Sequence, residues 1–447
     1  MALLGEQALQ HIAQGALAAS EADQTEVLIQ GGTAALTRFA NSHIHQNVEE
    51  SDLNIRVRAV IGKRIGVAAT DVVTAEGVRE VVQRAASLAR LQEENLDFVS
   101  LPGPKPQTTV DAYLERTAAF EPAERAAVVK EICEAARRAH LVAAGAFRTT
   151  RSEIAVANSL GVWGYHRETT ADANTVVMGE TASGHAERLA LDAGEIDAAA
   201  LAAEAIDKCK RGADPQDLAP GVYDVILEEY AVTDLMDYFA YLSFGAQAFT
   251  EKRSFMSGRL GKPVMGENIS IWDDGRSPAG IPAPFDGEGV PRERLDLIAA
   301  GVAKDVAWDS YYGSVAGHAS TGHALPAGDT FGPLTSNLFL APGTATKAEI
   351  LASTERGVWV SRFWYTRPVH PLTVVMTGMT RDGTFLIENG KIVRPVKNLR
   401  FTQSYLEAMN RVELIGRDTM LLPSFTGTCR VPALKIRGWA FTGATEF

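Results

Sequence analysis

The order of apolar and polar residues predicts alternating strands and helices in the first half of the chain. In residues 53–70 apolar side chains alternate with polar ones on either side of Gly62-Lys63-Arg64, which is the pattern of a β-hairpin. Strand-like segments also predominate from residue 145 to 190. Apolar residues at helical spacing predict helices over 74–92, 122–140 and 196–210.

Two proline-rich stretches interrupt this pattern and predict the domain boundaries. "LPGPKPQTTV" begins at residue 101, and "RGADPQDLAPG" ends at Gly221; neither can continue a helix or a central strand. We therefore expect an N-terminal α/β segment over 1–100, a central α/β segment over 101–215, and a C-terminal domain over 216–447.

Short β-rich runs separated by turn residues dominate the chain after residue 221. Arg381-Asp382-Gly383-Thr384 and Glu388-Asn389-Gly390-Lys391 are turn signals between apolar runs. The predicted fold class is α+β, a mixed sheet with helices followed by a mainly β C-terminal domain.

Composition and charge narrow the functional class. The 447 residues carry a net charge of −12, which argues against a nucleic-acid partner. The three cysteines form no CxxC pair, so neither a disulfide framework nor a cysteine-rich zinc site is expected. The N-terminal segment is predicted to be an amphipathic helix instead of a signal peptide, and no apolar run reaches the ~20 residues of a membrane span. We expect a soluble protein of the cytoplasm with no membrane association.

The stretch "LEEYAVTDLMDYFA", residues 227–240, places four carboxylates between a strand and a helix. Apolar residues at helical spacing follow Thr233, which is a residue type suited to an N-cap. Asp234 and Asp237 would then lie in the first helical turn, where the helix dipole favours carboxylates. This interpretation needs no metal, although a role as metal ligands stays open on the pattern alone.

Two histidine pairs also stand out. His318 and His323 lie in the Gly-rich segment "GHASTGHALPAGD", which is either a flexible polar loop or a loop that lines a cleft. His43 and His45 alternate, as exposed residues of a strand do. No P-loop, GxGxxG, HExxH or GxSxG motif occurs, so the residues alone indicate no catalytic mechanism.

Several segments, taken in order, resemble the TldD/PmbA family, also called the TldD/TldE metallopeptidases. They are "RFANSHIHQN", the hairpin over 55–70, "STGHA", "TSNLFLAPGTATKAEILAS" and "FLIENGKIVRPVKN". The resemblance extends from residue 38 to about 398. It implies a cytosolic dimer whose substrate channel lies between subunits, with a fold of the TldD/PmbA type.

In the TldD branch an HExxxH helix supplies two zinc-binding histidines and a general base, and a cysteine near the C-terminus completes the site. At that place this sequence has Glu229-Tyr230-Ala231-Val232-Thr233-Asp234. Glu229 and Asp234 replace the histidines, and Tyr230 replaces the base. Cys429 resembles the family's cysteine ligand, so an unusual metal site of Glu229, Asp234 and Cys429 is the alternative to a site without metal.

The resemblance therefore implies a TldE-like chain, which lacks HExxxH and pairs with a TldD-like subunit that carries the zinc. Such a chain would hold unfolded or extended peptides for proteolysis or peptide maturation and would have no catalytic residue or cofactor of its own. By analogy the substrate channel is lined by His318, His323, Ser336 and Asn337. The alternatives are an autonomous, divergent metal-dependent hydrolase and a homodimeric peptide-binding protein.

Overall fold

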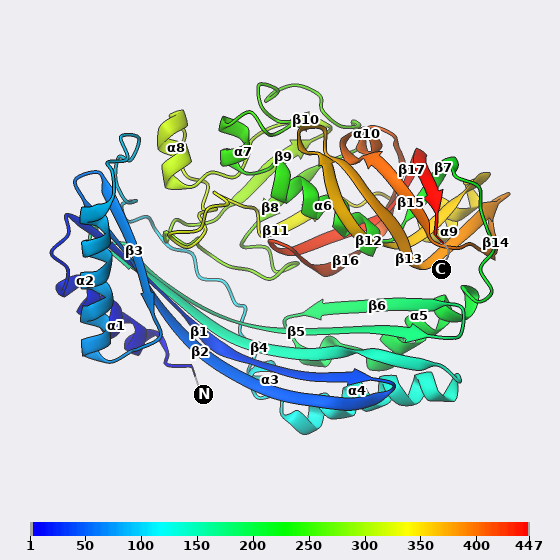
Figure 1. The fold of residues 1–447 in the computed structure, drawn as a ribbon, viewed down its shortest axis with the longest axis horizontal. Helices are drawn as coiled ribbons and strands as arrows, with labels where there is room; N and C mark the ends of the chain where they lie inside the picture. Colours follow the sequence, from blue (N-terminus) through cyan, green and yellow to red (C-terminus); the bar gives the residue numbers. More distant parts are fainter. Residues whose placement is uncertain (1–2, 446–447) are drawn as a thin grey trace.

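A long, curved six-stranded sheet forms the N-terminal half of the computed structural model, which describes residues 3–445 (Figure 1). Its strands lie in the order β3-β2-β1-β4-β5-β6, and all neighbouring pairs are antiparallel. The strands are β1 (Gln24–Ala40), β2 (His43–Ile61), β3 (Arg64–Thr70), β4 (Val142–Asn158), β5 (Trp163–Met178) and β6 (Ser183–Ala190). The predicted hairpin at residues 62–64 is confirmed, since β2 and β3 pair directly across that turn.

Two groups of helices cover this sheet at opposite ends and make two separate cores. α1 and α2 pack at one end against Ile29, Ile55 and Val57, while α4 and α5 pack at the other end against Phe147 and its neighbours (Figure 1). The helices are α1 (Glu6–Ala18), α2 (Ala75–Leu91), α3 (Glu115–Ala118), α4 (Pro122–Arg138) and α5 (Ala198–Arg211), with a 3-10 turn η1 (Ala193–Glu195). The three predicted helices of this half are confirmed to within a few residues.

The C-terminal half is built on an eleven-stranded sheet, so the expected α+β class with a strand-rich C-terminal part is confirmed. The strands are β7 (Gly221–Leu227), β8 (Ile271–Asp274), β9 (Arg294–Ala299), β10 (Val302–Ala303), β11 (Asn337–Leu340), β12 (Arg356–His370), β13 (Val375–Glu388), β14 (Lys391–Pro395), β15 (Leu399–Ser404), β16 (Val412–Ser424) and β17 (Gly427–Ala444). The helices are α6 (Glu229–Leu242), α7 (Ala246–Thr250), α8 (Ser310–Ala316), α9 (Lys347–Ala352) and α10 (Tyr405–Met409), with a 3-10 turn η2 (Pro371–Thr373).

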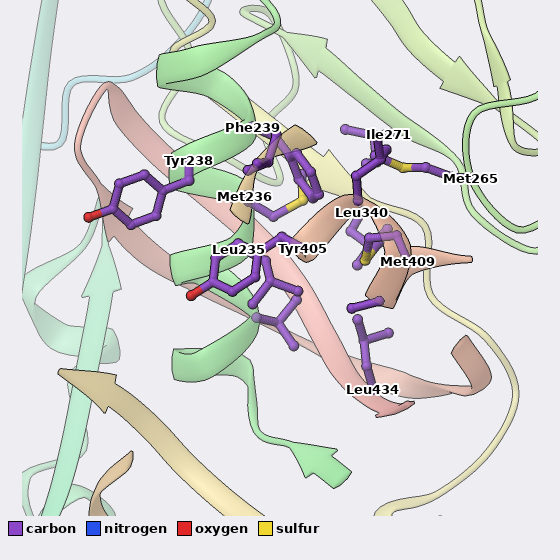
Figure 2. Close-up of a cluster of buried hydrophobic side chains, with 14 of the residues drawn as sticks. Leu235, Met236, Tyr238, Phe239, Met265, Ile271, Leu340, Tyr405, Met409 and Leu434 are labelled. Carbon is purple, nitrogen blue, oxygen red and sulfur yellow. The ribbon is translucent and has the colours of Figure 1, made fainter. Parts of the chain in front are cut away.

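Part of this second sheet closes on itself around the largest core. β7 pairs with β12 on one side and with β17 on the other, and β13 and β15 complete the ring of strands. α6 contacts β12, β16 and β17 and buries Leu235, Met236 and Phe239 in this core (Figure 2). The helix is therefore held by packing along its length, so its side chains have fixed positions.

One predicted turn is wrong. Arg381-Asp382-Gly383-Thr384 does not end a strand, because β13 continues through it opposite β12. The strand bulges there instead: the register shifts between Val360 and Arg362, and Asp382 and Gly383 adopt φ of 56° and 135°. The second turn signal is confirmed, since Asn389 and Gly390 join β13 to β14 with positive φ.

The chain crosses from the first sheet to the second between the end of α5 and the start of β7. The first sheet takes strands from both sides of residue 100, so the N-terminal and central segments share one sheet. Boundaries at residues 100 and 215 stay predictions. Among residues 3–445 no helix combines the length and apolarity that crossing a membrane requires.

Candidate functional site

A cavity of about 500 Å³ lies beside α6, in the stretch that the sequence analysis singled out. α6 supplies Tyr230, Asp234 and Asp237 to its wall, β6 supplies His185 and Glu187, and residues 362–367 of β12 supply a third side. The end of β16 and the turn after it, residues 422–425, complete the lining. The two halves of the chain therefore meet at this cavity.

The start of α6 differs from the prediction. β7 ends at Leu227 and the helix begins at Glu229, so Glu228 is the N-cap and Thr233 lies inside the helix. The Thr233 hydroxyl donates to the Glu229 carbonyl, 3.0 Å away, as threonines within helices do. Asp234 is consequently not a helix-start residue, and the same correction applies to Asp237, three residues further on. The helix starts before Thr233 because pairing in the sheet ends β7 at Leu227. Glu228 alone connects the strand to the helix.

The side chains of Glu229 and Tyr230 make contacts within the protein. Glu229 is 3% exposed and pairs with Lys347 at the start of α9, 2.7 Å away. The Tyr230 hydroxyl donates to Glu204 on α5 at 3.0 Å and accepts from Arg188 on β6 at 3.0 Å. Both side chains thus join separate elements of the fold.

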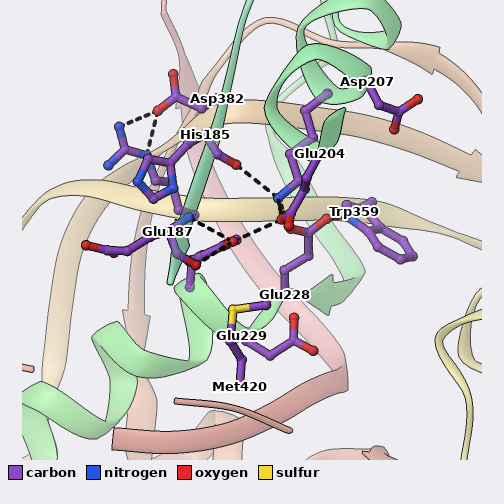
Figure 3. A network of polar contacts seen from close by, with 12 residues as sticks. His185, Glu187, Glu204, Asp207, Glu228, Glu229, Trp359, Asp382 and Met420 are labelled. Atoms are coloured by element: carbon purple, nitrogen blue, oxygen red, sulfur yellow. Dashed lines mark hydrogen bonds and ion pairs between the residues drawn. The ribbon is translucent and has the colours of Figure 1, made fainter. Parts of the chain in front are cut away.

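A buried lysine extends this network between the two halves (Figure 3). Lys208 on α5 is 3% exposed and lies 2.7 Å from both Glu204 and Glu228. Burial opposes its charge, but the two carboxylates hold the pKa of Lys208 above its usual range. Glu228 also accepts from the indole of Trp359 at 2.6 Å. The network ties α5 to the junction between β7 and α6.

Asp234 and Asp237 face the cavity from the next turns of the helix. Asp234 accepts hydrogen bonds from Tyr405 at 2.6 Å and from Thr366 at 2.7 Å, one on each oxygen. Asp237 accepts from Ser424 at 2.5 Å on one oxygen only. Burial raises the pKa of Asp234 to about 6 and that of Asp237 to about 7, and the hydrogen bonds lower both only in part.

These residues do not fit a zinc site. Cys429 on β17 is fully buried, and its burial, together with the charges of Asp237 and Asp273, raises the pKa of the thiol well above its usual value, whereas zinc binds the thiolate. Glu229 is committed to Lys347, and both oxygens of Asp234 already accept hydrogen bonds. Across residues 3–445 no three His, Cys, Asp or Glu side chains gather closely enough to hold a metal.

A larger cavity of about 730 Å³ lies between the first sheet and loops of the C-terminal half. Its walls include residues 30–34 of β1, residues 152–154 of β4, and the loop residues 283–287 and 324–326. Of the four side chains predicted to line a channel, Ser336 reaches this cavity, where Arg292 donates a short hydrogen bond to its hydroxyl.

His323 and Asn337 lie next to Ser336 but do not line the cavity, and their contacts hold the backbone at Ser336 in place. His323 is fully buried, and its Nε2 lies 3.1 Å from Asp273. The second oxygen of Asp273 accepts from the backbone N–H groups of Ser336 and Asn337, both at 2.8 Å. Burial alone would raise the pKa of Asp273, but the hydrogen bond and charge of His323 outweigh it and hold the pKa below the usual value. The Asn337 amide donates to the Asp274 carbonyl at 2.7 Å.

His318 lies apart from the other three. It is exposed and stacks on Trp308, with ring centroids 4.7 Å apart, and its Nε2 is 3.4 Å from Asp305. The resemblance predicted all four as channel residues, which stays a prediction. In the structure Asp273 connects His323, Ser336 and Asn337, and sequence reasoning did not point to it. The available signal was the pair Asp273-Asp274 before Gly275, two acids at the end of an apolar run.

Comparison with known proteins gives matches along nearly the whole chain. Residues 25–89 match the profile of PmbA/TldA metallopeptidase domain 1, residues 115–212 the central domain, and residues 220–443 the C-terminal domain. Among curated proteins, "Metalloprotease PmbA" of Escherichia coli O157:H7 is 25% identical over 228 residues, 50% of this chain and 48% of that protein. "Metalloprotease TldD homolog" of Buchnera aphidicola is 28% identical over 169 residues, 37% of this chain and 34% of that protein. These alignments span less than half the length of either relative.

Solved structures share the fold over nearly all of the chain. TldE from Thermococcus kodakarensis superposes with a TM-score of 0.89 at 20% identity, covering 98% of this chain and 100% of that one. A putative modulator of a DNA gyrase from Thermotoga maritima superposes with a TM-score of 0.87 at 19% identity, covering 97% and 100%. At this identity the likeness concerns the fold.

Proposed function

The chain belongs to the PmbA/TldA (TldD) metallopeptidase family, and from this membership we propose that it is the TldE-like, non-catalytic subunit of a two-subunit peptidase. In this proposal a TldD-like partner carries HExxxH and the zinc. The chain described here holds an extended peptide beside that metal, and its strand-rich C-terminal domain provides the dimer surface. The pair acts in the cytoplasm, which agrees with three cysteines that are all unpaired and buried.

The observation that carries the non-catalytic assignment is the state of the three motif positions. Glu229, Tyr230 and Asp234 are each held by contacts to a different element: α9 for Glu229, α5 and β6 for Tyr230, and β12 and α10 for Asp234. A metal ligand or a general base needs a lone pair that is free for the metal or the proton. At these three positions the side chains are instead engaged in contacts within the fold.

Peptide holding is supported by the cavity at Ser336. A subunit without chemistry can still accelerate cleavage, because correct placement of a reactant lowers a barrier by up to roughly 7–11 kcal/mol. His323, Asp273 and Asn337 fix the backbone at Ser336, so the cavity wall is rigid before a peptide arrives. The four predicted channel residues thus divide into Ser336 at the cavity, His323 and Asn337 behind it, and His318 at the surface.

The test is to produce the chain alone and together with an HExxxH-bearing family member from the same organism. We expect stable co-elution, about one zinc per pair carried by the partner, and peptide hydrolysis by the pair only. Stoichiometric zinc and hydrolysis in the isolated chain, lost to a chelator and restored by metal, would instead identify an autonomous enzyme.

A single substitution then tests the cavity. Ser336→Ala should raise the KM of the pair for peptide several-fold and leave co-elution unchanged, because one polar contact at the cavity is lost. Ser314→Ala, at an exposed position on α8, is the matched control and should leave KM unaltered. An unchanged KM in Ser336→Ala would place the peptide elsewhere.

A further inference from the structure

The cavity beside α6 is lined by hydrogen-bond acceptors that the fold does not use. The carboxylate of Glu187 has no hydrogen bond or ion pair among the described residues, and Figure 3 shows it pointing away from the Lys208 network. Asp237 uses one oxygen for Ser424 and for the Phe425 N–H, and its Oδ2 has no partner within residues 3–445. His185 is 7% exposed, and its Nδ1 is buried without a partner.

These three groups can accept hydrogen bonds from a ligand in the cavity. The buried Nδ1 of His185 has no partner, which costs free energy that a ligand with an N–H group would recover on binding. Glu187 and Asp237 add carboxylate oxygens that are free to accept from the same ligand. Burial and the nearby positive charges of Arg362 and Lys208 lower the pKa of His185 well below its usual value, so the ring is neutral and one nitrogen can accept. Burial and the charge of Asp172 raise the pKa of Glu187 to about 7, and the nearby Arg362 opposes this only in part.

The two arginines that line the cavity do not donate to these acceptors. Arg362 donates to Asp382 at 2.5 Å and lies over the ring of Trp364, 5.1 Å from its centroid. Arg367 donates to the Thr366 carbonyl at 2.7 Å and lies over the ring of Tyr365. Both guanidinium groups are therefore engaged at the rim, on the β12 side of the cavity.

Exposed aromatic side chains border the cavity, and its three acceptors come from two elements, β6 and α6. Trp364 and Tyr365 are 43% and 68% exposed, and Phe425, 66% exposed, packs edge-on against Tyr238 with centroids 5.7 Å apart. Aromatic faces attract organic cations. The acceptors, by contrast, do not gather into a shell that could hold a metal ion. An elongated cation with an apolar stem matches this arrangement better than a bare ion.

We propose that the cavity beside α6 binds the cationic side chain of a peptide, a lysine ammonium or an arginine guanidinium, with Glu187, Asp237 and His185 accepting its N–H groups and the aromatic rim enclosing its aliphatic stem. The site is distinct from the Ser336 cavity. It does not depend on pairing with a metal-bearing subunit, since all of its residues belong to this chain.

The experiment is calorimetric titration of the isolated full-length chain with three capped amino acids: the N-acetyl methylamides of lysine, arginine and norleucine. We expect the lysine compound, the arginine compound or both to bind with a dissociation constant of about 1 mM or tighter. Norleucine has the same stem without the charge and should not bind detectably. Equal binding of the norleucine compound, or no binding of either cation at about 10 mM, would overturn the proposal.

Two conservative variants assign the contacts. Glu187→Gln removes a charge that makes no hydrogen bond in the fold, and Asp237→Asn keeps an oxygen for Ser424 and Phe425, so both variants should fold normally by thermal unfolding. Each should weaken binding of the cation about tenfold or more, the usual loss for a charged hydrogen bond. Glu180→Gln, an exposed carboxylate outside the cavity, should bind as the parent does. Parental affinity in both cavity variants would refute the assignment.

Discussion

Four carboxylates lie within ten residues, from the end of β7 to the middle of α6, and their surroundings differ. Glu228 contacts Lys208, Glu229 contacts Lys347, and Asp234 and Asp237 face the cavity with their charges opposed by burial. Residue type alone could not distinguish them, because each partner lies far away in the sequence. The pKa values of Asp234 and Asp237 therefore depend on tertiary contacts.

Asp234 gives a prediction with a defined pH window. Burial raises its pKa from 3.8 to about 6. The folded state therefore binds the proton more tightly than the unfolded state, and stability is lost as the pH rises from about 4 to about 6. Asp234→Asn cannot titrate but keeps an oxygen for Tyr405. The stability of Asp234→Asn relative to the parent should rise across that window and stay level above it. The rise in free energy is at most about 3 kcal/mol, since one pKa unit corresponds to about 1.4 kcal/mol.

Thermal unfolding of both proteins at several pH values between about 4 and 8 measures this difference. Asp111→Asn removes an exposed carboxylate and should show no such pH dependence. A difference that is constant with pH, or that falls as the pH rises, would contradict the burial argument.

For single residues, the predictions from sequence held where burial and capping depend on neighbouring residues and were wrong where they depend on distant ones. Thr233 was assigned as an N-cap because cap preferences are local, but the helix start depends on where the sheet ends β7. His323 was assigned to a loop, and its burial depends on Asp273, fifty residues earlier. The exposed positions of His43 and His45 followed from alternation within one strand and are confirmed.

At the scale of elements, Lys208 on α5 is joined to Glu228, the N-cap of α6. Lys208→Met leaves Glu204 and Glu228 without their shared cation inside the protein. Breaking a buried ion pair in this way costs about 3 kcal/mol or more, so the thermal midpoint of a chain of this length should fall by roughly 3 °C or more. Calorimetry measures the fall.

Lys210→Met is the control on the same helix. Lys210 is exposed and two residues away, and its loss should change the free energy of unfolding by less than about 0.5 kcal/mol. Equal effects of the two substitutions would mean that the change in helix composition, and not the ion pairs, accounts for the loss.

Elements with strong local signals were predicted well. The β2–β3 hairpin, α2, α4, α5 and the Asn389-Gly390 turn all carry their pattern in contiguous residues. The Arg381–Thr384 stretch has the composition of a turn but forms a bulge, because β12 lies alongside and keeps β13 extended on either side. Pairing with a distant strand outweighed the local preference there.

At the scale of the whole molecule, Arg58 joins the two halves. It lies on β2, 2.5 Å from Glu26 on β1 and 3.0 Å from Glu288 in a loop of the C-terminal half. Arg58→Met leaves both carboxylates buried without a cation. We expect faster hydrogen–deuterium exchange across residues 283–292 and in β1 at pH 8.

The effect should be smaller at pH 5. Burial raises the pKa of Glu26 to about 7 even though Arg58 opposes this, so at pH 5 that carboxyl is largely neutral and repels Glu288 less. Arg64→Met, which removes an exposed ion pair with Glu94 at 3.6 Å, should leave exchange in these segments unchanged. Unchanged exchange in Arg58→Met would show that apolar packing alone joins the halves.

The pairing of β17 has a consequence for the order in which the protein forms during synthesis. β17 is the partner of β7, β11, β15 and β16, and all of these leave the ribosome before it does. The first sheet uses residues 24–190 only and can form while translation continues. The ring of strands that holds α6 has to wait for residues 427–444, with the edges of β7 and β15 unpaired in the meantime. A ribosome that stalls shortly before residue 427 would therefore carry a finished first half and an open, chaperone-dependent second half.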